Sequence, residues 1–174
     1  AEDLKKEVWI IPYAAYNEAK ALEREVQGLT DFGFKYENIK LFEKGVNATE
    51  GYIYVPGGDP FKLLRRIQEE QIVEDIVFCV TNGVTYIGVS AGADIACQDI
   101  GYVKAYADNN VIDDGDFKAL GLIPYNVICH YDHYSFSILR KVMTLSSVKE
   151  ISNNPIITLR DDQVVLIQDD NWEY

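Results

Sequence analysis

Short apolar runs alternate with amphipathic stretches along most of the chain. Runs of consecutive or alternating apolar residues predict strands at residues 8–11, 39–42, 52–55, 85–89, 125–129, 155–159 and 164–167. Stretches with apolar residues three or four positions apart, or rich in Ala, Leu, Glu and Lys, predict helices at residues 14–29, 61–70, 72–81 and 91–100. Strands that alternate with helices indicate an α/β fold, with a doubly wound, mainly parallel sheet and helices on both faces. In such sheets, functional groups gather outside the carboxyl ends of the strands.

Composition narrows the class of protein. A length of 174 residues predicts a single domain over residues 1–174, and 48% hydrophobic with 25% charged residues is ordinary globular usage. The 28 acidic and 16 basic residues give a formal net charge of −12. This charge argues against binding to nucleic acid or to an anionic membrane, because both need clustered cations.

Cysteine spacing and the N-terminus suggest a cytoplasmic location. The chain has three cysteines, Cys79, Cys97 and Cys129, and this odd number at wide spacing is not a disulfide framework. The chain also lacks a C-x-x-C pair of the kind that binds zinc. The charged segment 1–7 has no apolar signal core, and no apolar run reaches the length of about 18 residues that a membrane span needs. No cofactor is expected, and the protein is expected to be a monomer or a small homo-oligomer.

Residues 88–92, Gly-Val-Ser-Ala-Gly, fit the G-x-S-x-G pattern of a nucleophile elbow. A predicted strand precedes the motif and a predicted helix follows it. Glycines on both sides let the backbone turn sharply and expose the oxygen of Ser90. The amide of Ala91 would then lie at a helix N-terminus, where it could stabilise an oxyanion. The structural alternative is that Ser90 only caps the helix.

Gly57 and Gly58 follow another predicted strand and precede a helix that starts near Pro60. Adjacent glycines allow a ligand to approach the backbone closely, so the amide of Gly58 is a candidate second oxyanion donor. The alternative is a tight strand-to-helix turn capped by Asp59.

A serine nucleophile needs a base, and the chain has two histidines, His130 and His133. Both follow the predicted strand 125–129. Their H-x-x-H spacing leaves metal ligation open, and both could also be ordinary surface residues.

A third group must orient the histidine. Asp161 follows the predicted strand 155–159, with Asp162 beside it. The rival is an acidic loop that is otherwise a solvated turn, and its members are Asp108, Asp113, Asp114 and Asp116. Asp161 gives the chain order Ser, His, Asp, whereas the loop gives the α/β-hydrolase order Ser, Asp, His.

Four segments together resemble the dipeptidase E (aspartyl dipeptidase) family of serine peptidases. They are residues 55–64, residues 86–94, residues 117–124 leading to His130, and residues 156–161. The resemblance extends from Val8 to Ile167 and implies a fold like that of class I glutamine amidotransferases. This chain departs from the family pattern at Val89, where the family has Trp, and at Asp94, where the family has Asn. The resemblance also implies that the family's first and last strands are missing from this chain.

The resemblance implies a set of roles. Ser90 is the nucleophile, His130 is the base, and the amides of Gly58 and Ala91 form the oxyanion hole. Asp161 is the triad acid at a position where family members have Glu. Neither a metal nor a cofactor is implied.

The implied substrate is a small peptide, a dipeptide with N-terminal Asp. A protein of charge −12 must hold a local cation to attract an acidic substrate. Arg140 and Arg160 are the candidates, because arginine binds carboxylates with two parallel hydrogen bonds. The alternatives are a cyanophycinase-like hydrolase of β-aspartyl bonds and a peptidase-like module that binds a ligand without catalysis.

Overall fold

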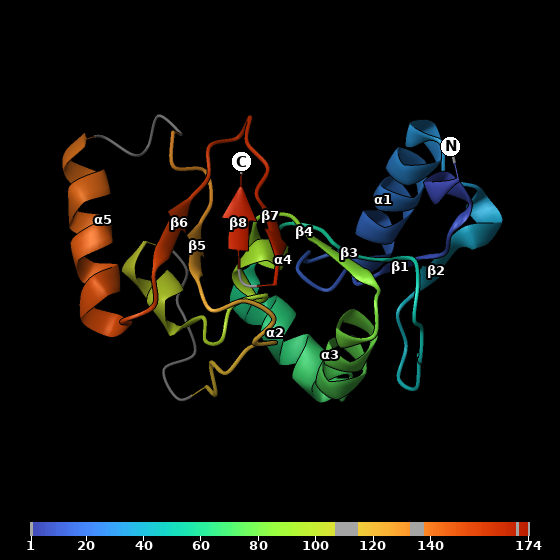
Figure 1. Ribbon diagram of the computed structural model, residues 1–174, viewed down its shortest axis with the longest axis horizontal. Coiled ribbons are helices and arrows are strands. Elements are labelled where there is room, and N and C mark those ends of the chain that lie inside the picture. Colours follow the sequence, from blue (N-terminus) through green and yellow to red (C-terminus); the bar gives the residue numbers. More distant parts are fainter. Residues whose placement is uncertain (1, 107–114, 133–137, 170, 174) are drawn as a thin grey trace. The chain divides into compact units, whose positions relative to one another are not determined.

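The computed structural model describes residues 2–106, 115–132, 138–169 and 171–173 (Figure 1). The chain divides into two compact units, Ala1–Gly92 and Ala93–Tyr174. Within the described ranges, every helix is too short or too polar to cross a lipid bilayer.

A parallel sheet forms the centre of the first unit. Its strands are β1 (Val8–Ile10), β2 (Ile39–Leu41), β3 (Tyr52–Val55) and β4 (Thr85–Gly88), in the order β2-β1-β3-β4. Val8 lies opposite both Ile39 and Tyr52, so β1 is central. The chain therefore winds outward in both directions from the boundary between β1 and β3, the point where ligands bind in doubly wound sheets.

Helices cover both faces of this sheet. They are α1 (Glu18–Phe32), α2 (Pro60–Glu69) and α3 (Val73–Thr81), and two short 3-10 helices, η1 (Asp3–Lys5) and η2 (Tyr36–Asn38), complete the unit. The connections β1-to-β2 and β3-to-β4 run in opposite directions across the sheet. Right-handed crossovers therefore place α1 on one face and α2 with α3 on the other, as Figure 1 shows.

Buried aliphatic side chains join these layers. Ile10 and Ile53 of the sheet, Leu63 and Ile67 of α2, and Ile76 of α3 are all fully buried. The spacing of Leu63 and Ile67 puts them on one side of α2, facing the sheet. Burial of each such side chain contributes about 1.5–3 kcal/mol, which fixes the helices on the strand framework.

The second unit contains two smaller pairs of strands. β5 (Asn126–Ile128) and β6 (Ile156–Thr158) are parallel, and α5 (Ile138–Ile151) connects them. β7 (Leu166–Gln168) and β8 (Asn171–Glu173) form an antiparallel hairpin. The short helix α4 (Ala91–Asp94) spans the boundary between the units, and the 3-10 helix η3 (Gly101–Ala105) lies against α5.

The predicted α/β fold is confirmed, since every predicted strand has a counterpart and the main sheet is parallel. The helix α5 was not predicted. Two adjacent parallel strands such as β5 and β6 need a crossover of a dozen or more residues, and this crossover is usually helical. The predicted strands 125–129 and 155–159 therefore already indicated a helix between them.

The predicted helix at residues 91–100 is wrong beyond Asp94, because later carbonyl groups bond elsewhere. The carbonyl of Ile95 accepts from the amide of Leu120, and the carbonyl of Cys97 accepts from the amide of Gly121. These carbonyls are therefore taken by a distant segment and are lost to helical i-to-i+4 bonding.

Candidate active site

Ser90 lies at the tight turn between β4 and α4. Its φ of +50° is in the left-handed region, which is uncommon for a residue with a side chain. The Val89 amide continues the sheet ladder by donating to the Val55 carbonyl at 2.9 Å, and the Gly92 amide closes the turn on the Val89 carbonyl at 2.9 Å. This strand-turn-helix geometry is that of a nucleophile elbow.

Two glycines allow the elbow to pack against β3 and its loop. A Cβ atom on Gly92 would lie 2.1 Å from the Val55 carbonyl oxygen, so only glycine fits where α4 meets β3. A Cβ atom on Gly57 would lie 3.0 Å from Cβ and 3.7 Å from Oγ of Ser90. The loop after β3 therefore lies directly beside the Ser90 side chain.

The loops after β1 and β3 are in backbone contact. The Asp59 amide donates to the Ala14 carbonyl at 3.0 Å, and a Cβ atom on Gly58 would lie 2.5 Å from that same carbonyl oxygen. Asp59 also caps α2, accepting from the amides of Phe61 and Lys62 at 3.0 and 3.1 Å. The capping alternative is thus observed for Asp59, and it fixes the position of the Gly58 peptide.

Lys62 binds the loop after β1, a contact that the sequence pattern did not reveal. Its ammonium donates to the carbonyls of Tyr13 and Ala15 at 2.8 Å each and to the Glu18 carboxylate at 2.6 Å. Burial raises the pKa of Glu18, but hydrogen bonds from Lys62 and Arg66 outweigh this effect and the pKa is lowered. The predicted helix at residues 14–29 consequently starts only at Glu18, with Asn17 accepting the Lys20 amide as its cap.

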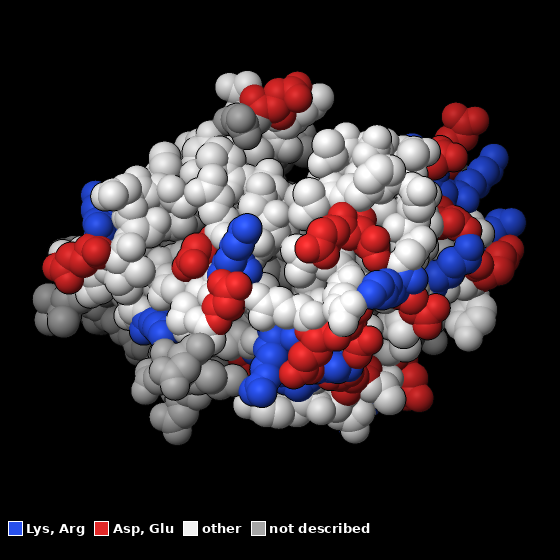
Figure 2. Space-filling model, turned by 90° about the horizontal axis from the view of Figure 1, so that it is seen from below, with Lys and Arg blue, Asp and Glu red and all other residues white. Residues whose placement is uncertain are grey.

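Ion pairs occupy the outer surface of α2. Arg66 pairs with Glu18, Glu69 and Glu70, and its guanidinium lies 5.0 Å from the centre of the Tyr13 ring. Figure 2 looks toward this helix from below and shows basic and acidic side chains next to one another. Lys62 and Arg66 are therefore both engaged by carboxylates.

In the second unit, His130 and Asp161 lie together at the carboxyl ends of β5 and β6. Nδ1 of His130 is 2.5 Å from Oδ1 of Asp161, and about half of each side chain is exposed. The parallel ladder continues past the two strands, because the Leu159 amide donates to the Ile128 carbonyl and the Tyr131 amide to the Leu159 carbonyl, both at 2.9 Å. Like Ser90, His130 has a left-handed backbone, with φ at +57°.

Asp132 also contacts the Asp161 turn, and sequence reasoning missed it. Its Oδ1 accepts the amide of Asp161 at 3.1 Å. The turn after β5 thus reaches Asp161 twice, through the His130 ring and through the Asp132 carboxylate. An acidic residue two positions after a candidate histidine, in the same turn, is the only sequence signal for this contact.

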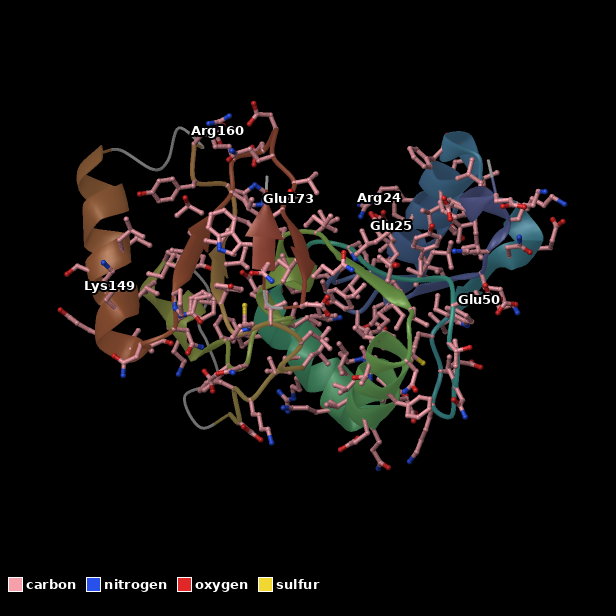
Figure 3. All side chains as sticks on the ribbon, in the orientation of Figure 1. Arg24, Glu25, Glu50, Lys149, Arg160 and Glu173 are labelled. Carbon is pink, nitrogen blue, oxygen red and sulfur yellow. The ribbon has the colours of Figure 1, made fainter. Side chains whose placement is uncertain are left out.

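The remaining candidate acids and arginines make contacts with other partners or lie outside the described residues. Asp116 accepts the Lys118 amide at 3.0 Å. Arg160, labelled in Figure 3, lies just beyond β6 and its Nε is 3.0 Å from Asp162, whose pKa this hydrogen bond lowers. Arg140 belongs to α5, and its side chain lies outside the described part of the structure, as do His133, Asp108, Asp113 and Asp114 entirely.

Asp94 is a buried carboxyl at the end of α4, within the second unit. The Tyr106 hydroxyl lies 3.3 Å from its Oδ1 and the Tyr102 hydroxyl 3.5 Å. Burial raises the pKa of Asp94 to about 7, although both hydroxyls act to lower it. The Tyr102 hydroxyl also donates to the Val127 carbonyl of β5 at 2.8 Å. In the described part of the chain, no group of three or more His, Cys, Asp or Glu residues is arranged to hold a metal ion.

Comparison with known proteins gives a family. The model of peptidase family S51 matches residues 1–174. A peptidase E from Nostoc sp. is 32% identical over 132 residues, which are 72% of this chain and 52% of the relative. A Drosophila melanogaster protein named as a probable alpha-aspartyl dipeptidase is 30% identical over 130 residues, with the same two coverages. The chain thus spans about half the length of these curated relatives.

Solved structures support the fold. A crystal structure assigned to a peptidase E protein from Listeria monocytogenes superposes with a TM-score of 0.69 at 22% identity, over 98% of this chain and 86% of that one. A peptidase from an acI-B1 Actinobacterium gives a TM-score of 0.59 at 16% identity, over 91% and 70% of the two chains. At these identities the likeness concerns the fold alone.

Proposed function

The chain belongs to peptidase family S51, and on that premise we propose that it is a serine peptidase acting on short peptides through Ser90, His130 and Asp161. The observation that carries the proposal is the left-handed turn at Ser90 beside Gly57. A serine that only capped a helix would not require a left-handed backbone packed against a glycine of the neighbouring loop.

The proposed reaction proceeds through an acyl-enzyme. Ser90 Oγ attacks the scissile carbonyl carbon while Nε2 of His130 accepts the hydroxyl proton. The C–N bond then breaks, and His130 returns the proton to the leaving amine. A water molecule attacks the ester in the same way, which releases the acid and restores Ser90.

Asp161 has the role of holding the imidazole. Its contact with Nδ1 favours the tautomer with the proton on that atom, and this leaves Nε2 free of a proton for the serine. Asp is one methylene shorter than the Glu that the family resemblance implies. The Asp132 contact and the continued parallel ladder support Asp161 in this role, because they draw its backbone toward His130.

The amides of Ala91 and Gly58 are the proposed oxyanion donors. Ala91 begins α4, and Gly58 lies in the loop that borders Ser90. In other acyl-transfer enzymes, one such donor contributes about 3–4 kcal/mol to the transition state. The missing side chain at Gly57 leaves space for a substrate carbonyl beside Ser90 Oγ.

The proposed substrate is a dipeptide with N-terminal Asp, an activity named for one relative. It requires a cation, and Lys62 and Arg66 are already engaged by Glu18. Arg160 and Arg140 are the proposed cations. The Arg160 side chain is about half exposed, whereas those of Lys62 and Arg66 are mostly buried, so Arg160 would exchange its contact with Asp162 for the substrate carboxylate. A panel of α-aspartyl, β-aspartyl and neutral dipeptides tests this assignment, since preference for β-aspartyl bonds would indicate the cyanophycinase-like alternative.

Labelling by a fluorophosphonate probe tests the nucleophile. We expect the folded protein to be labelled, Ser90→Ala to be unlabelled and inactive, and Ser152→Ala, a change at a serine that accepts a backbone amide elsewhere, to be labelled normally. A folded wild-type protein that resists the probe would favour a binding module without catalysis. Normal labelling of Ser90→Ala would reject Ser90.

A further inference from the structure

We propose that Lys62 is a positioning residue that fixes the Gly58 amide by holding the loop after β1 against it. The inference rests on the proposed function, in which that amide binds the oxyanion. Lys62 itself touches neither Ser90 nor, in the proposed reaction, the substrate.

The loop after β1 directs consecutive carbonyl groups at the start of α2. Lys62 Nζ binds the carbonyls of Tyr13 and Ala15, and the Asp59 amide binds the intervening carbonyl of Ala14. Because Asp59 and Lys62 belong to the cap and first turn of one helix, α2 holds the whole loop as a unit.

Gly58 is the residue that this loop supports. Its α-carbon lies so close to Ala14 that an added Cβ would be 2.5 Å from the Ala14 oxygen and 2.8 Å from the Ala14 Cβ. Backbone packed on backbone has no side chain to absorb a displacement. A shift of the loop therefore moves the Gly58 peptide, and with it the direction of its N–H group.

The charge of Lys62 is used within the protein. An ammonium group has three N–H donors, and here they meet three oxygen acceptors at 2.6–2.8 Å. Three-quarters of the side chain is buried, and the Glu18 carboxylate balances the charge. This arrangement suits a fixed support and is unsuited to a cation that exchanges partners with each substrate.

The test compares Lys62→Met with Arg65→Met. Arg65 is a cation on the same helix, is mostly exposed and pairs with Glu69 one turn away. Hydrogen exchange of the Asp59 amide, which donates to the Ala14 carbonyl, measures how often the loop after β1 separates from α2. This readout does not require catalytic activity. We expect exchange to accelerate about tenfold or more in Lys62→Met and to stay unchanged in Arg65→Met.

Inhibition gives the catalytic readout. A peptide aldehyde forms a tetrahedral adduct with a serine nucleophile and places an oxyanion in the hole, whereas KM reports ground-state binding. In Lys62→Met we expect the aldehyde to bind about tenfold or more weakly and kcat to fall by a similar factor, with KM nearly unchanged. Lys62→Arg, which keeps several donors, is expected to recover part of both effects.

The outcomes separate this inference from the proposed function. If the wild-type protein resists the fluorophosphonate probe, the proposed serine peptidase function is rejected. Amide exchange then still tests whether Lys62 holds the loop after β1 in place. If the wild type is labelled and Lys62→Met matches Arg65→Met in exchange and in aldehyde affinity, the positioning role is rejected. If Lys62→Met does not fold, Lys62→Gln, whose shorter amide reaches fewer carbonyls, is judged by the same readouts.

Discussion

Nδ1 of His130 lies 2.5 Å from Oδ1 of Asp161, and the two residues come from turns that follow adjacent parallel strands. Their separation in sequence is 31 residues, and the 14-residue helix α5 lies within that span. A hydrogen bond of this length between an imidazole and a carboxylate fixes both the tautomer and the orientation of the ring.

Asp161→Asn is expected to lower kcat about 10³–10⁴-fold, because an amide in this place favours the wrong tautomer of the histidine. KM is expected to change little, since the carboxylate does not touch the substrate. Steady-state kinetics on an N-terminal Asp dipeptide provides the measurement. Asp116→Asn is the control, and a large loss in that variant together with normal kinetics in Asp161→Asn would move the triad acid to the acidic loop.

Asp132 is expected to support catalysis through the Asp161 backbone. Asp132→Ala removes the acceptor of the Asp161 amide and should lower kcat about tenfold. Asp132→Asn keeps an oxygen at the same place and should retain most of the activity. The downfield proton NMR signal of the His130–Asp161 hydrogen bond should weaken in the Ala variant only, and an unchanged signal there would contradict the positioning role.

The buried carboxyl of Asp94 predicts that stability falls as pH rises from about 4 to 7. Burial raises its folded pKa to about 7, so the folded state keeps a proton that the unfolded chain releases near its ordinary value of 3.8. The stabilisation is therefore complete below pH 4 and is lost as pH rises toward 7, at a slope of up to about 1.4 kcal/mol per pH unit. Tyr102, Tyr106 and the thiol of Cys97 surround this group, and burial raises the pKa of that thiol to about 12.

Urea unfolding at several pH values measures this dependence. Asp94→Asn, which introduces the residue of the resembled family pattern, should remove the slope and be more stable than the wild type at pH 8. Asp99→Asn, a change at an exposed carboxylate, should keep the slope. Parallel curves for the wild type and Asp94→Asn between pH 4 and 7 would show that Asp94 is ionised in the folded state.

Local pattern was enough to predict the strands and to select the candidate site residues. The strand residues of β1 and β3 are apolar and largely buried, and such runs identify parallel strands without knowledge of their partners. Ser90, His130 and Asp161 were selected because each follows a predicted strand, and the structure brings the last two together. The two short two-stranded sheets of the second unit were not predicted, because pairing depends on contacts across the fold.

The supporting contacts could not be predicted from the sequence, since they connect distant residues. Lys62 bonds to carbonyls 49 and 47 residues away, and Asp132 bonds to an amide 29 residues away. A backbone carbonyl carries no signature in the sequence, so nothing distinguishes Lys62 from other helix-surface lysines. The same effect shortened α4, whose expected helical bonds are replaced by pairing with residues near Leu120.

Gly57→Ala tests whether the loop after β3 faces a working serine. The new methyl group would lie 3.0 Å from Ser90 Cβ and 3.5 Å from the Val89 carbonyl oxygen, so either the elbow or the loop must yield by a few tenths of an ångström. Such a shift misaligns Oγ with the proposed donors, and we expect kcat to fall about tenfold or more with a modest loss of stability. Gly28→Ala is the matched control, because a Cβ there meets open space on α1 and should stabilise the protein by about 0.5–1 kcal/mol without changing kinetics. Unchanged kcat in Gly57→Ala would mean that the reacting carbonyl does not lie beside this loop, and the oxyanion role of Gly58 would have to be given up.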